Sequence, residues 1–126
     1  MKTFASYGSL KKGYWNHSRF GLGEPISVSK IKGAMYVNPA LGYPHLYDVG
    51  IVPNAVEKDY EVEIYEVEDN VFNHIDGMEQ SSGYIPKEVV FEGIAPMGDI
   101  TATVWFADPE YRMPNADHYV EEYAKI

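Results

Sequence analysis

The sequence predicts an α+β fold, a small mixed and mainly antiparallel β-barrel with two or three short helices. The first observation is that five or six short segments alternate apolar and polar residues, which is typical of strands. The second is that two segments have the apolar spacing of short amphipathic helices. The third is that the 126 residues show no repeat or linker, so we expect one domain spanning residues 1–126.

The N-terminal half predicts two strands and a long loop. Residues 3 to 7 alternate weakly and end at Gly8-Ser9, which indicates a strand followed by a glycine turn. Residues 26 to 37 keep an interrupted period of two and predict another strand. Residues 38 to 54 are rich in Pro, Gly and Asn, so we expect an irregular loop there.

The middle of the chain predicts a strand and a helix. Residues 60 to 67 alternate apolar and acidic side chains, but Ile64 and Tyr65 are adjacent, so we expect a β-bulge between them. Apolar residues then follow the spacing of a short helix at Val71, Phe72, Ile75 and Met78. Asp69 or Asn70 is expected to cap this helix, Gly77 to lie near its end, and Glu79 to lie at or just beyond that end.

The C-terminal half predicts a strand pair and a last helix. Residues 85 to 91 and 100 to 106 alternate and are joined by a glycine-containing connection, which indicates two antiparallel strands. Residues 115 to 126 place apolar side chains on one helical stripe behind a polar cap, which predicts a helix.

Composition excludes several classes of function. The absence of cysteine excludes disulfides, thiolate metal sites and a cysteine nucleophile. A net charge of -9 disfavours nucleic acid and anionic membranes as partners, because both are polyanions. No apolar run approaches the roughly 20 residues of a membrane span, so we expect a soluble cytoplasmic protein. The 11 tyrosines fit a pocket lining or a homodimer contact equally, which leaves a monomer or a homodimer open.

Two features could carry chemistry. The turn of residues 7 to 13 follows a strand directly, so its backbone N–H groups could converge on a carboxylate or oxyanion, although a purely structural glycine turn is the commoner case. Glu79 precedes a turn that could fold its carboxylate toward the body of the protein. Desolvation there would raise the pKa of Glu79, as a proton shuttle near neutral pH requires. The alternative is a carboxylate on the surface. The four histidines have no metal-binding spacing, so no metal site is expected.

These residues resemble the gamma-glutamylcyclotransferase-like superfamily, of the gamma-glutamylamine cyclotransferase type. The resemblance covers about residues 3 to 106 and its motifs are Tyr7-Gly8-Ser9-Leu10 with Gly13 and Asn16-His17, Gly42-Tyr43-Pro44, the strand of residues 62 to 67, Ile75-Asp76-x-x-Glu79, and Tyr84. The motifs are short individually, and their order and spacing make the match specific.

The resemblance implies a cyclotransferase without a cofactor. Such enzymes release 5-oxoproline from a gamma-glutamyl amine or gamma-glutamyl amino acid, because the substrate's alpha-amino group attacks its own gamma-carbonyl. Carried over by position, Glu79 is the general acid-base, and the substrate-binding residues are Tyr7, Gly8, Ser9 and Leu10. Tyr84 could line the pocket.

The chain departs from the family pattern after Tyr84. The family pattern has a basic residue two positions after this tyrosine, where this chain has Pro86. Either Pro86 replaces the basic residue, or one residue is inserted and Lys87 takes its role. This departure concerns the leaving group more than the reaction. Two other functions stay open: a non-catalytic module that binds a small carboxylate or amine, and an amide hydrolase that uses water and releases glutamate.

Overall fold

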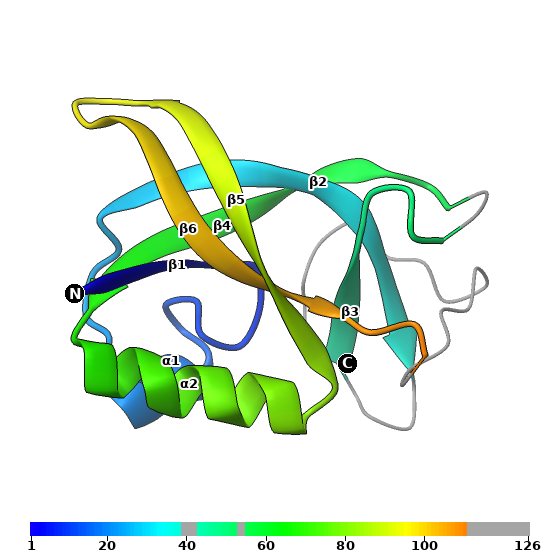
Figure 1. The fold of residues 1–126 in the computed structure, drawn as a ribbon, viewed down its shortest axis with the longest axis horizontal. Helices are drawn as coiled ribbons and strands as arrows, with labels where there is room; N and C mark the ends of the chain where they lie inside the picture. Colours follow the sequence, from blue (N-terminus) through cyan, green and yellow to red (C-terminus); the bar gives the residue numbers. More distant parts are fainter. Residues whose placement is uncertain (39–42, 53–54, 111–126) are drawn as a thin grey trace.

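The computed structural model describes residues 1–38, 43–52 and 55–110, which form a curved sheet with two helices against it (Figure 1). The strands are β1 (Lys2–Ser6), β2 (Ser27–Asn38), β3 (Tyr43–Asp48), β4 (Lys58–Val67), β5 (Tyr84–Ile94) and β6 (Gly98–Ala107), and the helices are α1 (Trp15–Phe20) and α2 (Asp69–Ser81). None of the described helices is long and apolar enough to cross a membrane.

The six strands form one mixed sheet in the order β3-β2-β4-β1-β6-β5. All neighbouring pairs are antiparallel except β1 and β6, which run parallel with Phe4 opposite Thr103. The sheet curls until its edge strands β3 and β5 approach each other, where Lys87 Nζ lies 2.5 Å from Asp48 Oδ2. The predicted α+β fold is confirmed, as a mixed half-barrel.

Both faces of the sheet are covered in the middle of β4, and this corrects the predicted bulge. Ile64 packs in one apolar cluster with Val62 and Val104, whereas Tyr65 packs in a second cluster with Phe4, under α2. Ile64 is buried on one face of the sheet and Tyr65 on the other, so two adjacent apolar residues require no bulge between them. Strand β4 accordingly keeps an unbroken register with both β1 and β2, and the prediction of a bulge there is wrong.

The segment expected to be a long irregular loop contains strand β3. Its register with β2 runs from Gly33 opposite Asp48 to Asn38 opposite Tyr43. Leu46 and Tyr47 are both buried, on opposite faces of the sheet, and this burial stabilises a strand that Pro and Gly conceal in the sequence. The predicted helix at residues 115 to 126 lies outside the described residues.

Helix α2 is longer than predicted. It continues to Ser81, so Gly77 lies inside it and Glu79 lies in its last turn, not at or beyond its end. The N-cap is Glu68, without a side-chain cap hydrogen bond, and neither Asp69 nor Asn70 has that role. The predicted strand pair of residues 85 to 91 and 100 to 106 is confirmed as β5 and β6, with a register shift between Phe91 and Ile94.

A substitution at Gly33 tests the close approach of β2 and β3, and a substitution at Gly77 in α2 is its control. A Cβ at Gly33 would lie 2.7 Å from the carbonyl oxygen of Tyr47, whereas a Cβ at Gly77 meets nothing within 4 Å. We expect Gly33→Ala to lower the free energy of unfolding by about 1 to 3 kcal/mol, because the backbone must shift. Gly77→Ala should raise it by about 1 kcal/mol, because alanine favours an exposed helix. Chemical denaturation measures both, and equal effects of the two substitutions would contradict the account.

Candidate active site

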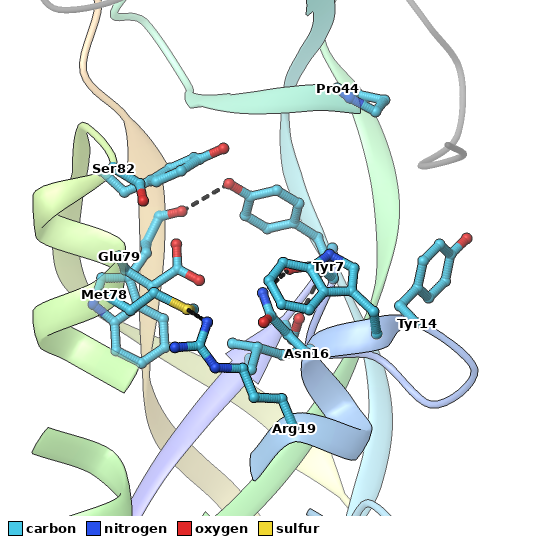
Figure 2. A pocket seen from close by; sticks show the side chains of 16 residues that line it. Tyr7, Tyr14, Asn16, Arg19, Pro44, Met78, Glu79 and Ser82 are labelled. Atoms are coloured by element: carbon cyan, nitrogen blue, oxygen red, sulfur yellow. Dashed lines mark hydrogen bonds between the residues drawn. The ribbon is translucent and has the colours of Figure 1, made fainter. Parts of the chain in front are cut away.

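A pocket of about 270 Å³ opens between the loop that follows β1, helix α1 and the C-terminal end of α2 (Figure 2). Figure 2 shows Tyr7 and Asn16 on one wall and Met78, Glu79 and Ser82 on the other, with the Glu79 side chain directed into the space between them. The lining residues are Ala5, Ser6, Tyr7, Gly8, Ser9, Leu10, Tyr14, Trp15, Asn16, Arg19, Pro44, Met78, Glu79, Ser82, Tyr84 and Trp105.

The pocket brings together the expected acid-base and all of the expected substrate-binding residues. These are Glu79, Tyr7, Gly8, Ser9, Leu10 and Tyr84. Lys87 does not line the pocket, because it extends from β5 to the Asp48 carboxylate on β3. The structure therefore places Lys87 at the closure of the sheet, where its contact is with another strand.

The loop after β1 lines the pocket and has backbone donors to spare. The N–H of Gly8 donates to Ser6 Oγ at 3.2 Å, and that of Lys11 donates to the Gly8 carbonyl at 2.9 Å, which closes a tight turn. Within the described part of the chain, the N–H groups of Ser9 and Leu10 have no acceptor. Successive free N–H groups in a turn suit an anionic oxygen, because both can donate to it.

Glu63 on β4 ties the far end of this loop to the sheet. Its Oε1 accepts hydrogen bonds from the N–H of Lys12 and from the Tyr65 hydroxyl, both at 2.6 Å. Burial, and then the neighbouring Glu63 carboxylate, raise the pKa of Tyr65, so its hydroxyl keeps its proton and donates. The loop is thereby held in place from its underside.

Trp105 on β6 connects the loop to helix α2. Its carbonyl accepts a hydrogen bond of 2.8 Å from the Tyr7 hydroxyl, and its indole N–H donates to Asp76 Oδ1 at 2.8 Å. The ring also packs against Phe4 and Phe72, with centroids 5.7 and 5.6 Å away. These contacts set the position of the loop relative to α2, and so relative to Glu79.

The surroundings of Glu79 favour its protonated form. Burial raises the pKa of Glu79 to about 7, and the negative charge of Asp76, one turn earlier on α2, adds to the shift. A carboxyl group with this pKa exchanges a proton readily near neutral pH, in either direction. Such a group can act as a base and then as an acid within one reaction.

Asn16 is a site residue that the sequence left without a role. Its side chain is only 4% exposed; Nδ2 donates to Ser9 Oγ at 2.8 Å, while Oδ1 accepts no hydrogen bond from the described residues. A buried carbonyl oxygen facing a pocket is suited to a donor such as an ammonium group. The short helix α1, which carries Asn16, has no apolar periodicity, so only the Asn16-His17 motif signalled it.

Tyr84 lines the side of the pocket where the sheet edges meet, and His45 contacts it from β3. His45 is 2% exposed, and its Nδ1 shares a hydrogen bond of 2.5 Å with the Tyr84 hydroxyl. This contact joins β3 to the start of β5 and orients a phenol that faces the pocket. Among the described residues, no group of three His, Asp or Glu side chains is placed to hold a metal ion.

The chain is similar in sequence to one described family. Residues 4–124 match the family described as gamma-glutamyl cyclotransferase, AIG2-like. A curated relative from Methanocaldococcus jannaschii, named "Putative gamma-glutamylcyclotransferase MJ1514", is 32% identical over 113 residues, which cover 84% of each chain.

Two solved structures share the fold. The protein PH0828 from Pyrococcus horikoshii, described as uncharacterized, has a TM-score of 0.62 and 22% identity, with 99% of this chain and 86% of that chain covered. An AIG2-like protein from Mus musculus has a TM-score of 0.62 and 20% identity, with 98% and 88% covered.

A titration tests the environment of Glu79. By carbon-13 NMR of the side-chain carboxyl groups, Glu79 should titrate near pH 7, and Asp76→Asn should lower that midpoint because a like charge is removed. The folded state then holds the proton more tightly than the unfolded state, so stability decreases as pH rises from about 4.5 to about 7. Glu79→Gln should abolish this decrease, and a midpoint near pH 4.5 would contradict the burial argument.

Proposed function

The chain belongs to the AIG2-like gamma-glutamyl cyclotransferase family, and we propose from this premise that it converts a gamma-glutamyl amine or gamma-glutamyl amino acid to 5-oxoproline. One observation carries the proposal: the Glu79 side chain and the loop of residues 7 to 10 line the same pocket (Figure 2). A family's general acid-base must lie beside its substrate-binding loop for the chemistry to occur.

The proposed binding mode uses the free polar groups of one wall. The N–H groups of Ser9 and Leu10 bind an anionic oxygen of the substrate, either its alpha-carboxylate or the oxyanion that develops on the gamma-carbonyl. The Asn16 Oδ1 accepts a hydrogen bond from the alpha-ammonium group, which supports the choice of this wall for the glutamyl part. The volume of about 270 Å³ suits a substrate of this size.

The substrate supplies its own nucleophile, so the protein needs no activated serine, cysteine or metal. Its main task is to hold the alpha-amine against the gamma-carbonyl carbon, since proximity can contribute about 7 to 11 kcal/mol to lowering a barrier. The alpha-nitrogen forms a bond to the gamma-carbon, and the bond from that carbon to the departing nitrogen breaks.

Glu79 moves the protons in this scheme. As a carboxylate it takes a proton from the alpha-ammonium group, which frees the lone pair for attack. As the acid it gives a proton to the departing nitrogen when the carbon–nitrogen bond breaks. The ring nitrogen also loses a second proton, which balances the proton that the released amine takes up from water. A pKa of about 7 suits the two transfers that Glu79 makes.

A substrate panel with Glu79→Gln tests the reaction. The purified protein should release 5-oxoproline from at least one gamma-glutamyl amine or dipeptide, and Glu79→Gln should lower kcat by about 10² to 10⁴, because the proton carrier is lost. Glu66→Gln is the matched control, since Glu66 is exposed on β4 and does not line the pocket.

The panel also separates the alternatives. Folded protein that binds members of the panel but releases no 5-oxoproline would overturn the proposal in favour of a binding module. Free glutamate in place of 5-oxoproline would indicate a hydrolase. Full activity in Glu79→Gln would remove Glu79 from the mechanism.

The pH dependence of kcat/KM tests the order of the proton transfers. Glu79 must begin as a carboxylate, so activity should fall as pH decreases through about 7, with a slope of one proton. Asp76→Asn should move this limb to lower pH, because it lowers the pKa of Glu79. A limb that stays in place in Asp76→Asn would show that another group controls it.

A further inference from the structure

Arg19 is the only cation among the described residues that line the pocket, and the proposed chemistry leaves it without a role. Glu79 is the other charged side chain in that lining. Within the described ranges, the Arg19 guanidinium forms no ion pair with any carboxylate. An arginine at a pocket with no acidic partner is available to an anionic group of a ligand.

The guanidinium is held in position by neutral groups. Nη1 lies 3.7 Å from Met78 Sδ, and the guanidinium carbon lies 5.7 Å from the Trp15 ring and 5.2 Å from the Phe20 ring. Figure 2 shows Arg19 reaching from α1 toward Met78, the residue before Glu79. These contacts orient the cation and leave its charge uncompensated.

The position of Arg19 separates it from the proposed glutamyl end of the pocket. Asn16 is buried beside the loop, whereas Arg19, one turn later on α1, is exposed. The scissile bond must lie next to Glu79 for proton transfer, so the departing amine extends from there toward solvent. The cation near Met78 therefore meets the leaving group and not the glutamyl carboxylate.

We propose, on the basis of the proposed function, that Arg19 binds a carboxylate on the departing amine, so that the preferred substrates are gamma-glutamyl amino acids. A guanidinium binds a carboxylate through paired charge-assisted hydrogen bonds, which an uncharged or cationic amine cannot form. Arg19 thus acts as a specificity residue.

A matched substrate pair isolates the carboxylate. Gamma-glutamyl-alanine and gamma-glutamyl-ethylamine differ only by that group. Release of 5-oxoproline gives kcat/KM, and calorimetry gives the affinity, for the parent, Arg19→Gln, Arg19→Lys and Lys30→Gln. Lys30 is the control, since it is exposed on β2, lies outside the pocket lining, and its replacement makes the same change in net charge.

The parent should prefer gamma-glutamyl-alanine about tenfold, mainly through KM and affinity. Arg19→Gln should bring the ratio for the two compounds to about one, Arg19→Lys should restore part of it, and Lys30→Gln should leave it unchanged. A ratio that persists in Arg19→Gln, or a parent with no preference, would overturn the inference. If no 5-oxoproline forms, the proposed cyclotransferase activity is rejected. The role of Arg19 is still decided in that case, by the ratio of the calorimetric affinities for the two compounds.

Discussion

The contacts of Trp105 are the constraint on which the pocket depends. Strand β1 runs parallel to β6, so the loop after β1 emerges beside Trp105, and the Tyr7 hydroxyl bonds to the Trp105 carbonyl. The indole N–H bonds to Asp76 on α2, one turn before Glu79. A single residue therefore fixes two walls that are some seventy residues apart in the sequence. Asp76 serves twice, because its negative charge also adds to the raised pKa of Glu79.

Much of the fold could be predicted because the spacing of apolar residues and the positions of turn residues are local features of the sequence. The alternation in β4, β5 and β6 and the apolar spacing in α2 identified these elements. Local pattern failed where burial came from two sides. Ile64 and Tyr65 suggested a bulge because one covered face was assumed, whereas each side chain has its own cluster. Strand β3 was missed because its proline and the surrounding glycines indicate a loop, and only Leu46 and Tyr47, once packed, show a strand.

The lining of the candidate site could be predicted as far as short motifs extend. The resemblance named the loop of residues 7 to 10, Glu79 and Tyr84, and the structure brings these residues to one pocket. Asn16 and Arg19 received no role because a six-residue helix carries no periodic signal, and their relation to Glu79 exists only in three dimensions. Lys87 was one of two alternatives after the motif tyrosine, and its charge meets Asp48 across the closing sheet, outside the pocket lining.

In the proposed reaction the substrate's own amine, and not water, attacks the carbonyl carbon beside Glu79. The most direct measurement is to incubate the protein with gamma-glutamyl-alanine in water enriched in oxygen-18 and to analyse the products by mass spectrometry. Intramolecular attack forms the new bond to nitrogen, so the account predicts 5-oxoproline without oxygen-18 and free alanine in equal amount. Glutamate that carries one oxygen-18 atom would show attack by water and contradict the account.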